Sequence, residues 1–223
     1  MTYKTWTSLG KLAGSPLEMP FVAFGRCSYP FSQSDLALLT EAEVSRGLKL
    51  TGSNQLTYFA SHVALWQLLA LMTGTFPEKP QITVSQEGKP MLQSHGLHFN
   101  MSRTDQSFLI GLAPVEIGVD VEETHVENMD LVMEHAFSHS EQGYCRQTDD
   151  PKAFTKVWTL KEAYVKALGT GLPDNLKNLN VIGPGNVIEQ SGLHSVSIQC
   201  PNQSVGSVVS RQGLENLICY SLA

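Results

Sequence analysis

The chain has 223 residues, of which 42% are hydrophobic and 16% are charged, and its net charge is −6. A disordered chain would carry more charge and less apolar content, and a broad nucleic-acid binder would show a dense basic run, which this sequence lacks. Residues 1–114 hold 8 basic and 7 acidic residues, whereas residues 115–223 hold 7 basic and 14 acidic ones. The excess acid therefore lies entirely in the second half.

The cysteines and the apolar runs indicate the cellular compartment of the protein. The four cysteines are Cys27, Cys145, Cys200 and Cys219. They are far apart and form no CxxC pair, so they suit neither a zinc site nor a disulfide framework. The first residues lack the apolar core of a signal peptide, and the longest apolar run, Val63–Met72, is too short to span a bilayer. We expect a cytoplasmic protein with reduced thiols and with neither a membrane nor a nucleic acid as partner.

In the first half, apolar spacing predicts helices over 34–47 and 55–73 and strands over 81–86, 97–102 and 107–112. Ser34 is the expected N-cap of the first helix, and Gly74 ends the second. A Gly88–Pro90 turn follows the first strand, and residues 103–106 join the last two strands into a hairpin.

In the second half, alternation predicts a strand over 117–122, and helical patterns cover 127–146 and 153–168. Three more strands are expected at 196–200, 206–210 and 217–222. Both halves thus read as helices combined with strands. The sequence predicts an α+β fold with an N-terminal half over 1–114 and a C-terminal half over 115–223.

The strand IGVDVE places Asp120 and Glu122 on one face, with Gly118 beside them. Side chains two apart on a strand are roughly 6–7 Å apart and point the same way. Two carboxylates so placed can hold a hard divalent ion, which prefers oxygen ligands. The alternative is an amphipathic strand whose polar face is solvated.

The segment 154–172 is a helix that carries both apolar and charged side chains. Its apolar stripe consists of Val157, Leu160, Tyr164 and Leu168. On a neighbouring face lie Trp158, Glu162 and Lys166, with Lys161 beside them. The alternative is an exposed helix with a Glu162–Lys166 ion pair. Together the two segments offer three carboxylates for a metal and lysines for phosphate, which suits phosphoryl or phosphodiester chemistry.

With these motifs, the chain resembles the Sfp-type 4′-phosphopantetheinyl transferases. GVDVE, FSHSE at 137–141 and WTLKEAYVKALGTGL match a signature of G-[IV]-D-x-E followed by W-x-x-K-E-[AS]-x-x-K. GKP at 88–90 and the HFNMS strand match landmarks of the first half. The resemblance implies two similar α+β halves in a pseudo-twofold arrangement, with the active site between them.

The resemblance also implies a reaction: phosphopantetheine passes from coenzyme A to a serine of an apo acyl or peptidyl carrier protein, with release of adenosine 3′,5′-bisphosphate. Asp120, Glu122 and Glu162 would hold Mg²⁺. Glu162 is the candidate base for the serine hydroxyl, with a metal-bound water as the alternative, and Asp120 and Lys166 complete the catalytic set. The family also implies a monomer.

The implied coenzyme A ligands are Lys89, Pro90, Ser102, Arg103, Lys161, Lys166 and Arg46. Lys166 and Lys161 would pair with the pyrophosphate, and Lys89 would lie near the nucleotide. Arg103 stands where the family commonly has a histidine; it could bind phosphate, or it could be a hairpin-tip residue in solvent. The helix over 55–73 lacks the family's arginines, so Arg46 and Lys49 are the basic candidates for the 3′-phosphate.

Two alternatives remain open. The chain could be a non-catalytic module of this fold that binds a carrier protein or coenzyme A, as the missing arginines suggest. It could also be another Mg²⁺-dependent phosphodiester enzyme. Transfer to a carrier, binding without transfer, and release of bisphosphate without a carrier distinguish the three.

Overall fold

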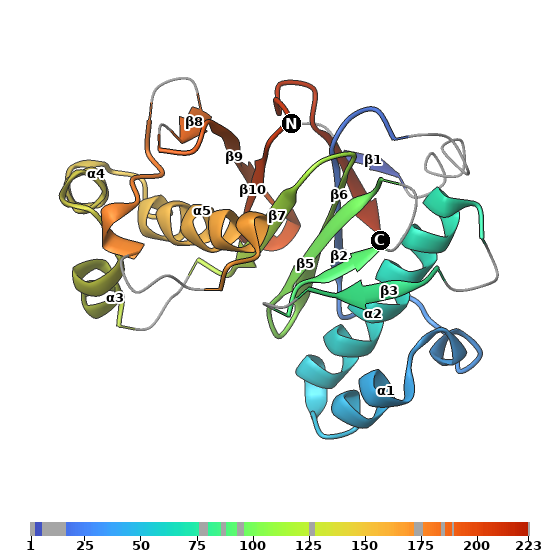
Figure 1. Ribbon diagram of the computed structural model, residues 1–223. Coiled ribbons are helices and arrows are strands. Elements are labelled where there is room, and N and C mark those ends of the chain that lie inside the picture. Colours follow the sequence, from blue (N-terminus) through green and yellow to red (C-terminus); the bar gives the residue numbers. More distant parts are fainter. Residues whose placement is uncertain are drawn as a thin grey trace.

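The structure is a computed structural model that describes residues 3–5, 17–75, 80–85, 88–92, 96–124, 128–171, 176–183, 186–188 and 190–222. Helices and several sheets combine in it, so the predicted α+β class is confirmed. Figure 1 shows the helices on the two outer sides and the main sheets between them. The pseudo-twofold relation of the halves stays a prediction.

Two main sheets form the centre of the molecule. The five-stranded sheet has the order β1 (Tyr3–Thr5), β11 (Ile218–Leu222), β2 (Phe21–Arg26), β6 (Ser107–Ala113) and β5 (His98–Arg103). The four-stranded sheet has the order β7 (Ile117–Glu122), β10 (Val205–Ser210), β9 (Leu193–Gln199) and β8 (Val187–Ile188). A small hairpin pairs β3 (Ile82–Val84) with β4 (Pro90–Leu92). The predicted strands are therefore all present, with ends shifted by a few residues.

The last strand, β11, lies apart from its neighbours in sequence. It pairs in parallel with both β1 and β2, so the C-terminal strand belongs to the sheet of the first half. The boundary between residues 114 and 115 stays a prediction. Strand β11 follows that boundary in the sequence but belongs to the sheet of the first half.

Three hydrophobic cores hold the layers together. Helix α2 (Gly52–Thr73) packs on the outer face of the five-stranded sheet, with Phe21 and Phe108 in the shared core. Helix α5 (Ala153–Leu168) covers the outer face of the four-stranded sheet. Between the sheets, Leu109 packs with Val119 and Val208 in the third core. The layer order is therefore helix, sheet, sheet, helix (Figure 1).

Helix α2 is almost wholly a core element. It has the length and apolar composition to cross a membrane, yet 72% of its most apolar stretch is buried inside the molecule. Its burial against the sheet accounts for its hydrophobic sequence.

Two predicted helices are each divided in the structure. The first prediction, 34–47, is wrong in its start: a short 3₁₀ turn η2 (Asp35–Leu38) precedes helix α1 (Glu41–Gly47), and Ser34 makes no side-chain cap. Thr40 is the N-cap, because its side chain accepts from the backbone N–H of Glu43 while the Glu43 carboxylate accepts from the N–H of Thr40. This capping box sets the helix start.

The pattern over 127–146 divides in the same way. It forms α3 (Met129–Ala136) and α4 (His139–Gln147), separated where Ser138 and Glu141 make a second capping box. Helix α5 has the predicted bounds and ends at Gly169, whose φ of 71° is left-handed. Leu168 of the predicted apolar stripe is exposed, whereas its neighbour Ala167 is buried. Two further 3₁₀ turns are η3 (Leu176–Asn178) and η5 (Pro201–Gln203).

Candidate active site

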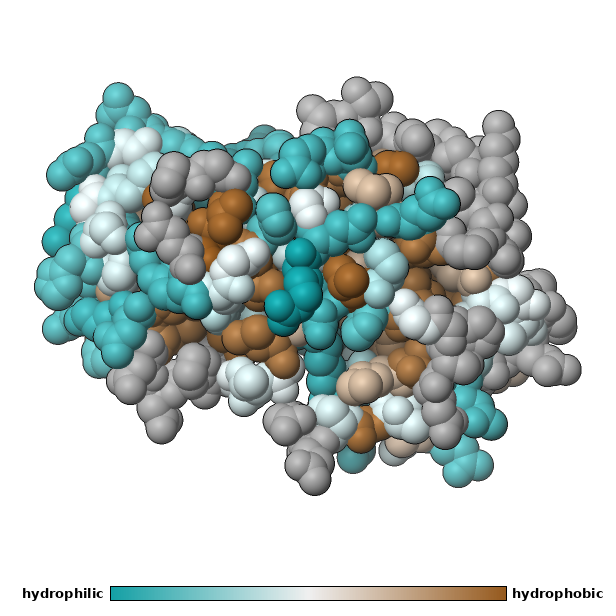
Figure 2. Space-filling view, turned by 45° about the horizontal axis from the view of Figure 1, so that its top comes forward, coloured by the Kyte–Doolittle hydropathy of each residue, from teal (hydrophilic) through white to brown (hydrophobic). Residues whose placement is uncertain are grey.

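The site lies where an edge strand of one sheet contacts an edge strand of the other. Strand β5 ends the five-stranded sheet and β7 ends the four-stranded sheet. The Asn100 side-chain oxygen on β5 accepts the backbone N–H of Val119 on β7 at 2.9 Å, and the Ser102 hydroxyl donates to Asp120 Oδ1 at 2.7 Å. Strongly hydrophilic side chains lie among hydrophobic ones in the middle of the face shown in Figure 2. This seam joins the two halves through polar side chains.

A glycine lets helix α5 approach strand β7 closely. A Cβ at Gly118 would lie 2.0 Å from the carbonyl oxygen of Ala163 and 2.3 Å from the backbone nitrogen of Ala167. Only glycine fits that spacing, as is common where another backbone comes near a strand. The close approach brings Glu162 and Lys166 to the face of β7 that carries Asp120.

Asp120 is the most buried of the three predicted carboxylates, with 2% of its surface exposed. The Lys166 ammonium donates to its Oδ1 at 2.6 Å and to the Ser102 hydroxyl at 3.1 Å. Among the described residues, Oδ2 of Asp120 has no hydrogen-bond partner. Burial raises the pKa of Asp120, and the Lys166 charge opposes that shift.

Glu122 and Glu162 lie half-buried beside Asp120. Burial, helped by the charges of Asp120 and Glu162, raises the pKa of Glu122 to about 7. The Lys166 charge and a hydrogen bond from Trp158 oppose this shift. Burial, followed by the charge of Asp120, also raises the pKa of Glu162. The three carboxylates therefore disfavour one another's charge, which a bound cation would relieve.

The predicted metal ligands fit Mg²⁺ in their chemistry. They supply only oxygen donors, and the unpartnered, buried Oδ2 of Asp120 is an open acceptor for a hard cation. Within the part of the chain that the structure describes, no three His, Cys, Asp or Glu side chains converge as metal ligands. Lys166 is the counter-ion of Asp120 in this arrangement.

Lys161 lies away from the site, which corrects the prediction that it pairs with pyrophosphate. Its side chain has no exposed surface and its ammonium forms an ion pair with Glu141 at 2.9 Å. It also donates to the carbonyl oxygens of Leu176 and Leu179. Lys161 and Glu162 are adjacent on a helix, so they point about 100° apart around its axis. Lys161 therefore faces the core of the second half.

Lys89 and Pro90 lie on the β3–β4 hairpin. The Lys89 ammonium donates to the carbonyl oxygens of Lys166 and Ala167 at 2.7 and 2.8 Å, and burial lowers its pKa. Pro90 begins β4 and lines a cavity of about 570 Å³. The hairpin thus touches the end of α5.

Arg103 points to the opposite side of β5 from Ser102. Its guanidinium donates to the Asn54 side chain and lies 5.2 Å from the centre of the Tyr58 ring, so it contacts α2 rather than projecting freely from the hairpin tip. Burial lowers the pKa of His62, and the charges of Arg103 and Arg46 lower it further, which places both arginines near this part of α2. Lys49 is exposed.

The 570 Å³ cavity lies between the first-half helices and β5. Its walls include His62, Trp66, Ile82, Pro90, Asn100 and Met101. Asn100 also holds the edge of β7, so this cavity adjoins the carboxylate site. Asn100 and Gly118 belong to the HFNMS and GVDVE motifs, but the sequence analysis assigned neither of them a role in the site. The signals were a polar residue two before Ser102 on a strand, and a glycine inside an alternating strand.

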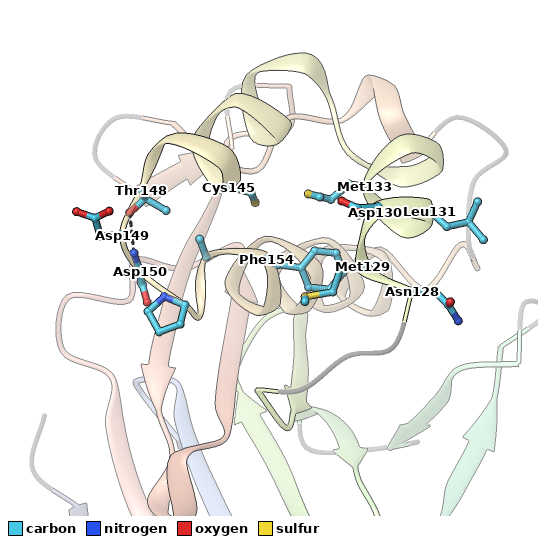
Figure 3. Close-up of a pocket in the computed structure, with 12 residues that line it drawn as sticks. Asn128, Met129, Asp130, Leu131, Met133, Cys145, Thr148, Asp149, Asp150 and Phe154 are labelled. Atoms are coloured by element: carbon cyan, nitrogen blue, oxygen red, sulfur yellow. Dashed lines mark hydrogen bonds between the residues drawn. The ribbon is translucent and has the colours of Figure 1, made fainter.

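A larger cavity, about 890 Å³, lies elsewhere, between α3 and the start of α5 (Figure 3). Figure 3 shows Met133 and Cys145 on opposite sides of it, above Phe154. Its lining contains none of the predicted site residues. Size therefore does not mark the predicted site, whose distinguishing features are the carboxylates with raised pKa values and the adjoining Lys166.

Known proteins share the second half most clearly. A family model described as the 4′-phosphopantetheinyl transferase superfamily matches residues 116–204. A protein of Haemophilus influenzae assigned as a 4′-phosphopantetheinyl transferase is 25% identical over 166 residues, which cover 68% of this chain and 69% of that protein. A 4′-phosphopantetheinyl transferase of Aneurinibacillus migulanus is 27% identical over 92 residues, or 40% of this chain and 38% of that one.

A third relative is a much longer protein. Fatty acid synthase subunit alpha of Penicillium patulum is 34% identical over 97 residues, which cover 40% of this chain and 5% of that protein. The match to the family model begins just before Asp120 and includes Glu162 and Lys166. The resemblance to the 4′-phosphopantetheinyl transferase superfamily is thereby confirmed.

Proposed function

From this resemblance to the 4′-phosphopantetheinyl transferase superfamily, we propose that the chain transfers the 4′-phosphopantetheine group of coenzyme A to a serine of an apo carrier protein. The reaction depends on Mg²⁺ and releases adenosine 3′,5′-bisphosphate. The observation that carries this proposal is the cluster of Asp120, Glu122, Glu162 and Lys166 at the seam between the sheets, with one buried carboxylate oxygen left open.

The bond changes balance as a phosphoryl-type transfer. The serine Oγ forms a bond to the β-phosphorus of coenzyme A, and the bond from that phosphorus to the bridging oxygen breaks, so that oxygen leaves with its electron pair on the adenosine bisphosphate. The half-buried Glu162 accepts the serine proton. Its raised pKa suits a carboxylate that must hold a proton during turnover.

Three carboxylates, through a bound cation, and one lysine would offset the negative charge of the phosphates. Asp120, Glu122 and Glu162 would hold Mg²⁺, which neutralises negative charge on the pyrophosphate. Ser102 orients Asp120 through its hydroxyl. Lys166, with 29% of its side chain exposed, supplies a positive charge at the open side of the cluster.

The coenzyme A site extends into the first half. The 570 Å³ cavity beside Asn100 suits the nucleoside part, since its lining is mostly apolar with few polar groups. Arg103 and Arg46, near Tyr58 and His62, are the cations for the remaining phosphates. The chain acts as a monomer in the cytoplasm, where the thiols of its four cysteines stay reduced.

Carrier proteins of fatty acid, polyketide or nonribosomal peptide synthesis are the proposed acceptors. The similarity to a segment of a fatty acid synthase subunit supports a carrier-protein substrate. Both the net charge of −6 and the acidity of carrier proteins disfavour long-range attraction, so recognition depends on local contacts.

The decisive experiment combines the chain with coenzyme A, Mg²⁺ and a panel of apo carrier proteins, and measures the intact mass of each carrier. We expect the carrier to gain one phosphopantetheine, and Asp120→Asn to abolish the gain. Asp149→Asn, an exposed aspartate by the other cavity, is the matched control and should leave the gain unchanged. An absence of mass gain across the panel would refute transfer.

The second candidate is a non-catalytic module that binds coenzyme A or a carrier protein. Two observations favour it: α2 contains no arginine, and no three carboxylates of the described residues converge as metal ligands. Calorimetry with coenzyme A and with each apo carrier tests it. Binding without any mass gain would establish the module, whereas a mass gain would exclude it.

A further inference from the structure

A lysine from the first half forms hydrogen bonds with the C-terminal end of α5. The Lys89 ammonium donates hydrogen bonds to the carbonyl oxygens of Lys166 and Ala167, at 2.7 and 2.8 Å. These carbonyls belong to the last turn of the helix, where no further turn supplies N–H donors. A cation at this position also interacts favourably with the negative end of the helix dipole. The contact is therefore specific to the helix end.

The surroundings of Lys89 hold its side chain in this direction. Gly169 follows the helix with a left-handed φ of 71°, and a Cβ there would lie 2.8 Å from Cδ of Lys89. The aliphatic stem of Lys89 thus passes directly over Gly169. On its own hairpin, Lys89 is fixed by backbone hydrogen bonds: its N–H donates to the Ser85 hydroxyl, and its carbonyl accepts the N–H of Ser85.

The backbone that Lys89 contacts includes that of Lys166, a residue of the site. Lys166, whose carbonyl accepts from Lys89, donates through its own ammonium to Asp120 and to Ser102. Lys166 is therefore held at both ends: Lys89 binds its backbone carbonyl, and its own ammonium reaches the carboxylate cluster.

We propose that Lys89 is a positioning residue, which clamps the end of α5 to the first half and so fixes Lys166 against Asp120. This role differs from the nucleotide contact that the family resemblance implies for Lys89. Its catalytic consequence rests on the proposed transferase function, whereas the clamp itself does not.

The two roles of Lys89 predict different defects. A clamp acts on the geometry of Lys166 beside the reacting phosphate, so its loss lowers kcat more than it raises the KM for coenzyme A. A phosphate ligand contributes binding in the ground state, so its loss raises KM instead. The clamp also restrains the last turn of α5 in the absence of any substrate.

The test compares Lys89→Met, which keeps the aliphatic stem, with Lys89→Gln, which keeps a shorter donor. Lys177→Met is the matched control, because the Lys177 ammonium also donates to a backbone carbonyl, that of Glu134 on α3. The first readout is hydrogen exchange of the amides of residues 165–170 without ligand. We expect Lys89→Met to speed this exchange by about tenfold, Lys89→Gln by less, and Lys177→Met not at all.

The second readout is steady-state transfer. We expect Lys89→Met to lower kcat by about tenfold with KM for coenzyme A within about twofold, and to add little to the defect of Lys166→Met. Unchanged exchange at residues 165–170 would overturn the clamp. A rise in KM with unchanged kcat would assign Lys89 to phosphate instead. If neither the wild type nor any variant transfers phosphopantetheine, the proposed function fails. The hydrogen-exchange measurement still shows whether Lys89 restrains the end of α5.

Discussion

Helix α5 carries two lysines that each pair with a buried carboxylate, yet the two pairs differ in what surrounds them. Lys161 and Glu141 are 2.9 Å apart, and neither side chain has exposed surface. Lys166 and Asp120 are 2.6 Å apart, with 29% and 3% of their side chains exposed. One pair is enclosed by the second half, and the other lies at the seam between the sheets.

The pairs also differ in how completely their polar atoms are used. Glu141 accepts the backbone N–H groups of Ser138 and Val181, and Lys161 donates to two carbonyl oxygens of the loop that follows α5. Asp120 keeps one buried oxygen without a partner among the described residues. A buried pair with every bond made stabilises one structure, whereas an incomplete pair can accept a ligand. We therefore expect substitutions in the first pair to damage stability and those in the second to damage function.

The largest expected effect is that of Glu141→Gln. The substitution leaves the enclosed Lys161 ammonium without its counter-charge, so we expect the free energy of unfolding to fall by about 3–5 kcal/mol. Urea unfolding at pH 7 measures it. The double variant Glu141→Gln with Lys161→Met removes both charges and keeps an acceptor for the backbone N–H groups of Ser138 and Val181, so it should recover part of that loss. A double variant as unstable as the single one would contradict this explanation.

Gly118→Ala tests the close approach that assembles the second pair. The new methyl group would collide with the backbone of α5 at Ala163 and Ala167, which cannot move aside as a side chain can. We expect a loss of about 1–3 kcal/mol in the free energy of unfolding, together with loss of transfer. Gly143→Ala, where a Cβ meets nothing within 4 Å, is the matched control. Equal effects of the two substitutions would show that the approach is unimportant.

Asp120→Asn should change the free energy of unfolding by less than about 1 kcal/mol, because it removes a buried charge while its amide oxygen can still accept from Ser102 and Lys166. Thermal unfolding at pH 7 measures this. Addition of Mg²⁺ should raise the melting temperature of the wild type and not that of the variant, since a ligand stabilises only the state that binds it. An equal rise in both would place the cation elsewhere.

At neutral pH the smallest effect is that of Tyr29, a buried group outside both pairs whose ionisation matters only at high pH. Burial, with a contribution from Asp35, raises the pKa of Tyr29 from 10.0 to about 12. Between these values the folded chain keeps a proton that the unfolded chain has lost, so stability is complete below pH 10 and falls as pH rises towards 12. At pH 11 the loss is about 1 kcal/mol. Tyr29→Phe should flatten the fall in urea unfolding between pH 9 and 11, and an unchanged slope would contradict the assignment.

Much of the fold could be predicted from the sequence because it depends on neighbours in the chain. The alternation of IGVDVE puts Asp120 and Glu122 on one strand face, and the bounds of α5 follow from its apolar spacing and from Gly169. The capping boxes at Thr40 and Ser138 were also readable, although the longer helical patterns concealed them. The sequence likewise sufficed for the family resemblance.

By itself, the sequence determined the local elements and the set of chemically capable residues, since helical and strand periodicity fix the direction in which each side chain leaves the backbone. Only the tertiary structure decided what each side chain meets. It enclosed Lys161 with Glu141, brought Lys89 to the end of α5 and placed β11 in the first sheet. The physical reason is that burial and polar partners come from segments distant in the chain, so two lysines five residues apart on one helix acquire different roles.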